Sequence, residues 1–268
     1  MSVDVAVNRA QIVPAIESLS GWIAATIKDL PDTSIPVPGA EWTVGEVGAH
    51  VSDAQRLFAR IAAGEIVRHG DGTPGSLAHA NQNLLTINKQ RDGRALAAAI
   101  VEQTRNFLAN AASVPPSRSF DTPMGRMDTE TMYAYMLTHL LMHGFQVSEA
   151  LKKPIPVERS AVQLTLPFLK YSMPLVVDAK KAGKLRAIYQ LKLRGGPKIW
   201  VKLDRGIATV HDEKPGRVDC YVSADPVSLL KVALKIKSQW PMIAKGKLFA
   251  WGPKPWLGFR FAGLFVPP

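Results

Sequence analysis

The chain has 268 residues, 47% of them apolar and 21% charged, which are values of a folded globular protein and exclude a disordered one. This length suits one large domain or two of ordinary size, and no run of about 18 apolar residues predicts a membrane-spanning helix. The formal net charge of +11 is uneven: Met1–Pro154 carries 13 basic and 15 acidic residues, whereas Ile155–Pro268 carries 20 basic and 7 acidic ones. This change in charge predicts a domain boundary, with domains over residues 1–154 and 155–268.

Two features that the sequence lacks bear on the cellular compartment: an export signal and a second cysteine. The first residues lack a basic start followed by an apolar run, so we expect no export signal. The single cysteine, Cys220, cannot form an internal disulfide, and together these features favour the cytoplasm. Structural zinc bound by cysteine clusters is excluded, so any metal must use His, Asp or Glu side chains.

Helical periodicity dominates the first domain. Apolar residues spaced three or four apart predict a helix within Asn8–Leu30. The capping-box pattern Thr43-x-x-Glu46 starts a second helix, which carries His50 between Glu46 and Asp53. Weaker helical patterns cover Ser76–Gln90 and Asp92–Ala112. Gly70, Gly72 and Gly75 fit G-x-G-x-x-G by spacing alone, but a helix precedes them, so we interpret them as a loop.

The last helix of this domain, Tyr133–Ala150, holds the densest candidate chemistry. His139 and His143 are four residues apart and therefore lie on one side of the helix, and Gln146 continues that row. Two imidazoles at this spacing can bind one metal ion, although the same spacing also occurs in ordinary helices. We assign no role to the remaining histidines, His69, His79 and His211. Four long helices joined by proline and glycine loops predict an all-α four-helix bundle.

The second domain has a different pattern. Residues 160–182 look helical with proline interruptions, and alternating apolar residues from Leu185 onwards predict four strands separated by glycine turns. Asp225-Pro226 starts a helix, and Lys247–Trp251 is a candidate fifth strand. We therefore expect an α+β domain with a mostly antiparallel sheet.

Three motifs in the first domain resemble the DinB-like superfamily and, within it, the mycothiol-dependent maleylpyruvate isomerase family. They are W-T-V-G-E-V-x-A-H at Trp42–His50, T-P-x-G at Thr122, Pro123 and Gly125, and H-G-x-x-x-x-x-A-L at His143–Leu151. The resemblance implies a metal, usually zinc, bound by His50, His139 and His143. The isomerase branch usually has Glu at the position of His139 and Asp at the position of Gln146. The chain departs from that pattern at both positions, which puts the isomerase reaction itself in question.

The resemblance implies a thiol enzyme. A metal-bound thiol loses its proton near neutral pH and can attack an electrophile. Cys220 is expected inside the sheet, so a small thiol such as mycothiol is the expected cosubstrate, and a small-molecule electrophile is the expected substrate. Glu46, Asp53 and Gln146 are candidates to orient the ligands or the thiol, with solvated or helix-capping roles as the alternative. The expected function is a metal-dependent, mycothiol-using isomerase or transferase.

Residues 160–268 resemble the sterol carrier protein-type fold through K-G-x-L-x-x-x-G at Lys245–Gly252 and an apolar tail. This resemblance implies an apolar tunnel for lipids, so a non-enzymatic lipid carrier is the alternative function. Basic charge and a terminal run of aromatic residues also favour contact with lipid or an anionic membrane surface, unless these aromatic residues simply close the core. No nucleic acid partner is expected, because no binding module is recognised. The candidates for lipid contact are Trp240, Trp256, Phe259, Arg260 and Phe261.

Overall fold

The computed structural model describes residues 8–266, and they divide into two compact units between Pro156 and Val157. The N-terminal unit is mostly helical, and the C-terminal unit contains a five-stranded sheet. The prediction of a helical first part and a sheet-containing second part is therefore confirmed. Among the described residues, no helix is long and apolar enough to cross a bilayer.

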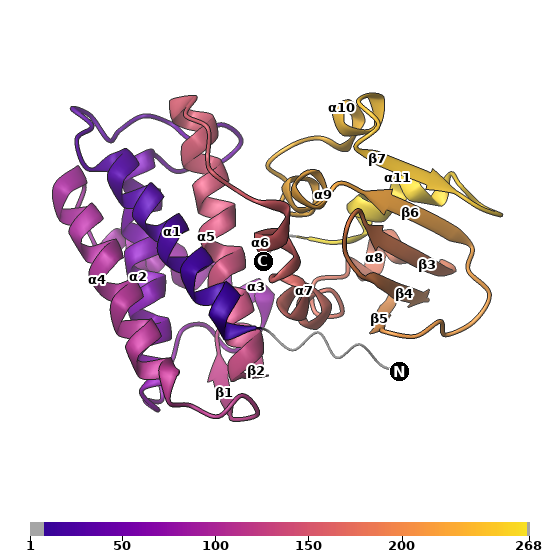
Figure 1. The fold of residues 1–268 in the computed structure, drawn as a ribbon, viewed down its shortest axis with the longest axis horizontal. Helices are drawn as coiled ribbons and strands as arrows, with labels where there is room; N and C mark the ends of the chain where they lie inside the picture. The colour runs from indigo at the N-terminus through magenta and orange to yellow at the C-terminus, as the bar shows by residue number, and fades with distance from the viewer. Residues whose placement is uncertain (1–7, 267–268) are drawn as a thin grey trace. The chain divides into compact units, whose positions relative to one another are not determined.

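The N-terminal unit is built on four long helices that run alongside one another (Figure 1). Both α4 and α5 contact α1 and α2. The apolar stripe predicted on the first helix is fully buried, with Ile12, Ile16 and Ile23 each 0% exposed. The four helices are α1 (Arg9–Ile27), α2 (Val44–Ala62), α4 (Gly93–Ala112) and α5 (Thr129–Leu151).

Two smaller elements complete this unit. Helix α3 (Pro74–Ile87) contacts α2, and an antiparallel hairpin of β1 (Ser119–Thr122) and β2 (Gly125–Asp128) precedes α5. No pattern in the sequence predicted the hairpin. Its turn is closed by the Thr122 hydroxyl, which donates to the carbonyl of Gly125 at 2.7 Å, and Gly125 has a φ of 98°, which favours glycine.

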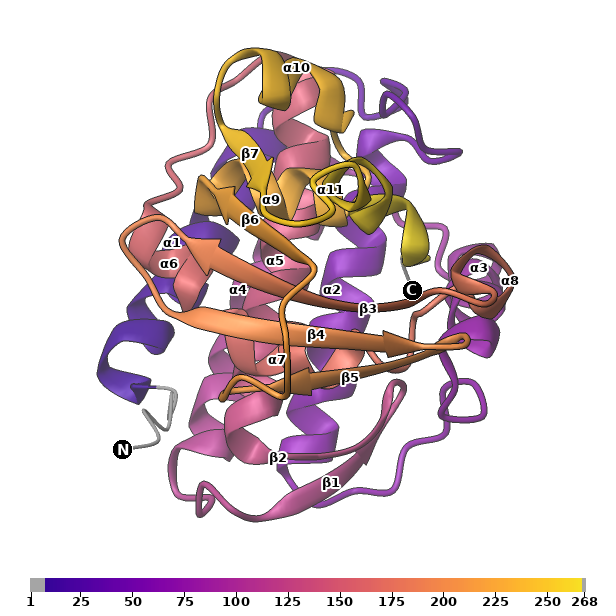
Figure 2. The same cartoon turned by 90° about the vertical axis from the view of Figure 1, so that its right-hand side faces the viewer.

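The sheet of the C-terminal unit has the strand order β5-β4-β3-β6-β7 (Figure 2). Neighbouring strands pair antiparallel except β3 and β6, which pair parallel. Alternate side chains of each strand point into the core, as the sequence pattern predicted for Tyr189 and Val201. The strands are β3 (Arg186–Leu193), β4 (Lys198–Asp204), β5 (Ile207–His211), β6 (Cys220–Ala224) and β7 (Leu248–Trp251).

Short helices surround this sheet. The buried face of β3 and β4 packs against Leu257, Phe261 and Leu264, which come from the last two helical segments. Residues 160–182 form three short helices rather than one, because prolines interrupt the run. The helical segments are α6 (Arg159–Gln163), α7 (Leu166–Ser172), α8 (Ala179–Ala182), α9 (Pro226–Ala233), α10 (Gln239–Ala244), α11 (Leu257–Phe261) and η1 (Ala262–Leu264).

Candidate metal centre

His50 is positioned by helix α2, whose start is defined by a capping box. The Thr43 hydroxyl accepts the backbone N–H of Glu46 at 3.3 Å, and the Glu46 carboxylate accepts the backbone N–H of Thr43 at 2.8 Å. These bonds satisfy donors that a helix start would otherwise leave without partners. The defined start sets the helix register, and His50, about two turns later, is 5% exposed.

His139 and His143 are positioned by helix α5. The side chain of Asp128 caps its start by accepting the backbone N–H of Thr131 at 2.7 Å. The two histidines are one turn apart and buried, with exposed fractions of 9% and 1%. A Cβ at Gly144 would lie 2.5 Å from Cδ1 of Ile155, so a larger residue there would require the Ile155 side chain to shift.

The three imidazoles converge on one point inside the unit. One ring nitrogen of each lies within 4.8 Å of a ring nitrogen of the other two. The closest pair is His139 Nε2 and His50 Nε2, at 2.9 Å. Ring centroids lie 4.4 to 4.9 Å apart in tilted or edge-on pairs. Two distant parts of the chain therefore present three nitrogens to a single volume.

Burial keeps these rings uncharged. Desolvation lowers the pKa of His50 and of His139 well below the usual value, and His143 adds electrostatic repulsion to both. Burial also lowers the pKa of His143, to about 4, although a hydrogen bond to Gln146 opposes this shift. At pH 7 all three are neutral imidazoles, which is the form that binds metal ions.

Gln146 orients His143 and leaves one of its nitrogens available. The carbonyl oxygen Oε1 of Gln146 lies 2.7 Å from His143 Nδ1, so this nitrogen carries the proton and donates it. The lone pair of His143 is then on Nε2, which is buried and has no hydrogen-bond partner among the described residues. His139 Nδ1 is also buried without one. Unpartnered buried nitrogens are costly, so each calls for an explanation.

Trp42 covers the histidines and was not among the predicted site residues. Its ring is nearly parallel to that of His143, 6.2 Å away between centroids, and tilted against that of His50 at 4.8 Å. The indole N–H donates to Oε1 of Gln82 on α3 at 3.2 Å. The available signal was the position of Trp42 at the start of the Trp42–His50 motif, directly before the capping box.

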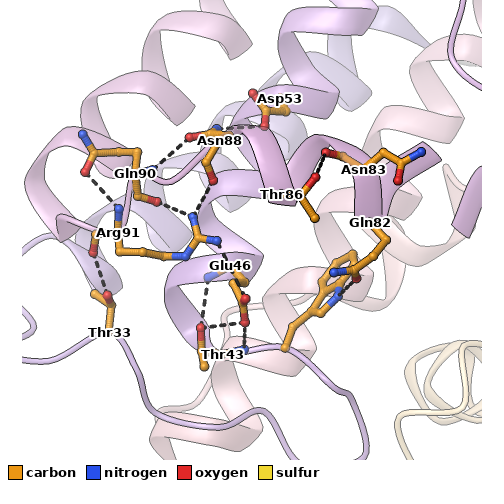
Figure 3. Close-up of polar contacts among 11 residues, drawn as sticks. Thr33, Thr43, Glu46, Asp53, Gln82, Asn83, Thr86, Asn88, Gln90 and Arg91 are labelled. Atoms are coloured by element: carbon orange, nitrogen blue, oxygen red, sulfur yellow. Dashed lines mark hydrogen bonds and ion pairs between the residues drawn. The ribbon is translucent and has the colours of Figure 1, made fainter. Parts of the chain in front are cut away.

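The carboxylates of Glu46 and Asp53 accept hydrogen bonds from Thr43 and Asn88, respectively (Figure 3). Glu46 belongs to the capping box and also lies 3.7 Å from the Arg91 guanidinium. Asp53 accepts a hydrogen bond from the Asn88 amide at 2.8 Å and pairs with Arg56. Their observed role is to hold the start of α2 and the segment after α3, so a role in orienting ligands remains only a prediction.

The residues proposed for lipid contact lie in the C-terminal unit and divide into two groups. Trp240, Trp256 and Phe259 are exposed, with fractions of 47 to 59%, and Arg260 is exposed too. Phe261 is 7% exposed and packs against Tyr189 in the core. Phe261 therefore packs in the core and does not face a membrane, and contact of this residue with a lipid held inside the unit stays a prediction.

Comparison with known families identifies the N-terminal unit. Residues 17–148 match the model of the mycothiol maleylpyruvate isomerase N-terminal domain. This unit is a mycothiol maleylpyruvate isomerase N-terminal domain. The isomerase-type domain includes all three histidines as well as Trp42 and Gln146. No curated protein sequence matches the chain closely enough to count as a relative.

Solved structures extend the likeness in fold to most of the chain. The mycothiol-dependent maleylpyruvate isomerase aligns at 12% identity and a TM-score of 0.54, covering 92% of this chain and 95% of that one. A histidine-to-alanine mutant of that enzyme aligns at 13% identity and a TM-score of 0.53, with the same coverage of both chains. At such identities the likeness establishes the fold and nothing about the reaction.

The C-terminal region also has a partial structural neighbour. The UbiJ-SCP2 ubiquinone synthesis protein aligns with 40% of this chain and 90% of that chain at 19% identity, with a TM-score of 0.28. Such a low score supports no statement about function.

Proposed function

We propose that the N-terminal unit is a DinB-like four-helix bundle that binds a divalent metal ion, zinc, through His50, His139 and His143. The observation that carries this proposal is the convergence of three buried, neutral imidazoles on one volume. The packing of α4 and α5 on α1 and α2 supports the bundle. The isomerase-type domain assignment supports the choice of site.

The residues present fit such an ion. In a tetrahedral zinc site with Zn–N distances of about 2.0–2.1 Å, ligand nitrogens lie roughly 3.3 Å apart. His50 Nε2 and His139 Nε2 are 2.9 Å apart and would have to separate slightly, whereas nitrogens as far apart as the 4.8 Å limit of the cluster would have to approach. Ligation would also satisfy His143 Nε2, a buried acceptor with no hydrogen-bond donor among the described residues. The Gln146–His143 hydrogen bond is the usual outer partner of a metal-binding histidine.

The chemistry offered by the site requires a thiol from outside the chain. When bound, a divalent ion held by three nitrogens leaves a position for a thiol and lowers its pKa, which makes the thiolate available near neutral pH. Cys220 cannot supply this thiol, because it is fully buried in the C-terminal unit and burial raises its pKa to about 11. A small thiol, which we propose is mycothiol, therefore acts as cosubstrate.

The reaction class that we propose is addition of this thiol to a small electrophile. The thiolate donates its electron pair to an unsaturated carbon, and the charge moves onto the conjugated carbonyl of the substrate. Expulsion of the same thiol after bond rotation gives an isomerase, whereas retention of the new C–S bond with uptake of a proton gives a transferase. The Trp42 ring lies against His50 and His143, and we propose that it limits access of water to them.

The two departures from the isomerase pattern change the charge of the side chains around the proposed metal site. Where that branch is expected to have Glu and Asp, this chain has His139 and Gln146, which are both neutral here. Three neutral ligands cancel none of the charge of the ion, so a bound thiol is more acidic than at a site with one carboxylate. We therefore propose thiol activation as the conserved step and leave isomerase and transferase as the two outcomes.

Three finer expectations remain predictions. They are the sterol carrier protein-type fold with a lipid-carrier function for residues 155–268, the bundle as the whole of residues 1–154, and a cytoplasmic location. A lipid that copurifies with the C-terminal unit, detected by native mass spectrometry, would favour the carrier function.

Metal analysis of protein purified without chelators tests the proposal. We expect about one zinc ion per chain in the wild type and almost none in His139→Ala. His79→Ala is the matched control, because His79 is exposed on α3 and is expected to leave the metal content unchanged. Maleylpyruvate conversion is then measured with and without mycothiol. A wild-type protein that takes up no zinc even when zinc is added would end the proposal.

A further inference from the structure

The large aromatic side chains exposed in the described structure gather around strand β7. Five of them, here called the aromatic surface, lie between residues 240 and 259, with exposed fractions from 39 to 60%. They come from α10, from β7, and from α11 with the residue before it, and both α10 and α11 contact β7 (Figure 2). The aromatic surface consists of Trp240, Phe249, Trp251, Trp256 and Phe259.

These side chains project from anchored backbone. Met242 and Ile243 of α10 pack with Leu248 of β7 in a small core, which holds α10 against the strand. A Cβ at Gly258 would lie 2.4 Å from the Cβ of Ala250, so glycine is what lets α11 approach β7 so closely. Gln239 further joins α10 to α11 by donating to the carbonyl of Phe259 at 2.7 Å. The aromatic rings are therefore exposed by a fixed arrangement.

The rings are also arranged in stacks that leave flat faces exposed. Trp240 stacks on Phe259 at 5.7 Å between centroids. On the outward side of β7, Trp251 stacks on Phe249 at 5.8 Å and on Tyr221 of β6 at 5.5 Å. Stacking shields part of each ring from water, but exposing this much aromatic area is unusual for a surface without a partner.

Basic residues dominate the sequence around the aromatic surface, and of these Lys254 pairs with Asp219 at 2.8 Å. From Pro226 to the end of the chain there are seven lysine and arginine residues and no aspartate or glutamate. Lys245 directly follows α10, and Arg260 lies in the last turn of α11. Both side chains are exposed. A partner for this surface therefore carries negative charge and accepts aromatic side chains.

We propose that the aromatic surface docks on an anionic lipid bilayer. Tryptophan is favoured at the boundary between head groups and acyl chains, where its ring is buried and its N–H stays hydrated. Lysine and arginine beside it attract anionic head groups, each contributing most within a Debye length of the membrane. The same combination of shallow insertion and attraction produces reversible membrane binding without a spanning helix. This surface takes no part in the thiol chemistry proposed for the N-terminal unit.

Sedimentation with vesicles tests the proposal on the full chain. Wild-type protein is mixed with sucrose-loaded vesicles of phosphatidylcholine in which about 30% of the lipid is phosphatidylglycerol. This proportion gives a strongly anionic surface. The double variant Trp240→Ala/Phe259→Ala is expected to lower the partition coefficient by about tenfold or more. Ile207→Ala, which removes an equally exposed apolar side chain from β5, is the control and is expected to change binding by less than about twofold.

Variants that remove one positive charge each measure the electrostatic contribution to vesicle binding. Lys245→Gln and Arg260→Gln are each expected to weaken binding by about fivefold. Lys198→Gln, which changes an exposed lysine at the start of β4, is expected to leave binding unchanged. Raising the salt concentration should weaken wild-type binding to the anionic vesicles. Circular dichroism of each variant confirms that it remains folded.

Four results would overturn the proposal. Vesicles of pure phosphatidylcholine serve as the uncharged comparison. Wild-type protein that sediments with neither the anionic nor the uncharged vesicles, or equally with both, has no anionic membrane site. Equal vesicle binding by the wild type and the folded double variant would exclude the aromatic surface. Binding of single-stranded oligo(dT), lost in the double variant while vesicle binding is not, would assign the surface to nucleic acid. A dimer in ultracentrifugation that the double variant abolishes, without vesicle binding, would assign it to a second copy of the chain.

Discussion

The two units depart from the usual distribution of polar and apolar groups in opposite directions. The N-terminal unit buries His50, His139 and His143 among packed helices. The C-terminal unit exposes Trp240 and Phe249 to more than half of their surface. Buried polar groups and exposed apolar patches are the two distributions that ordinary folding does not explain. Each therefore marks a candidate functional site.

The two departures respond to different variables. A buried, neutral cluster is governed by protonation and by ligation, because its pKa values are lowered by desolvation. An exposed aromatic and basic surface is governed by ionic strength and by the medium it meets, because its charges are screened in water. The comparison predicts that substitutions in one unit leave the property of the other unchanged.

The largest effect is expected for His143→Ala. Removing this ligand should lower thiol-dependent turnover by about a thousandfold or more, because charge stabilisation by a bound metal is worth several kcal/mol. Vesicle binding by the same variant should stay within about twofold of the wild type. Steady-state kinetics and vesicle sedimentation of one preparation check both. The reciprocal variant, Trp240→Ala, should retain turnover, and loss of both properties in either variant would break the comparison.

Acid should destabilise the metal-free protein through its buried histidines. The pKa of His143 is about 4 in the folded chain and 6.5 when unfolded, so the unfolded state binds the proton between these values. Stability is therefore fully present above pH 6.5 and falls as the pH drops toward 4, by about 3 kcal/mol from this group. His50 and His139 act in the same direction.

Urea denaturation of chelator-treated protein between pH 7 and pH 4.5 measures this loss. His79→Ala should show the same pH dependence as the wild type, because His79 is exposed. His143→Leu removes the titrating group and should show a smaller loss. A stability that rises as the pH falls through this range would contradict the assignment of neutral, buried imidazoles.

Local patterns allowed much of this structure to be predicted. The Thr43–Glu46 capping box defined the start of α2. Strand alternation placed Tyr189 and Cys220 in the core. The spacing of His139 and His143 selected them as candidate ligands, and the structure brings both next to His50. Their binding of metal is still a prediction.

Features that depend on distant contacts could not be predicted in this way. No local pattern shows that Trp42 lies against two histidine rings or that β3 pairs parallel with β6. The different exposure of Phe259 and Phe261 follows from helix geometry, because residues two apart on a helix point about 200° away from each other. If Phe259 is exposed, Phe261 must face the core, as observed.

A smaller effect is expected at Gln146, which acts through His143. Gln146→Leu removes the acceptor for His143 Nδ1 and should weaken zinc affinity by about 10- to 100-fold, with little change in the unfolding temperature of the metal-free protein. Gln146→Glu keeps an acceptor at this position and should restore most of the affinity. Competition with a chromophoric chelator measures both. Equal affinities for the wild type and Gln146→Leu would show that His143 needs no orienting partner.

The smallest effect, but the most specific, is expected for His139→Glu. This change introduces the carboxylate expected of the isomerase branch, which can still ligate but carries a negative charge. A carboxylate ligand cancels part of the charge of the ion, so the pKa of a bound thiol should rise, and the acidic limb of the pH–rate profile should move upward by about one unit. Zinc content should stay near that of the wild type, whereas it is lost in His139→Ala. A profile that does not move, with zinc retained, would mean that a residue other than a metal-bound thiol limits the rate. A profile that moves upward would tie the neutral charge of three imidazoles directly to the acidity of the attacking sulfur.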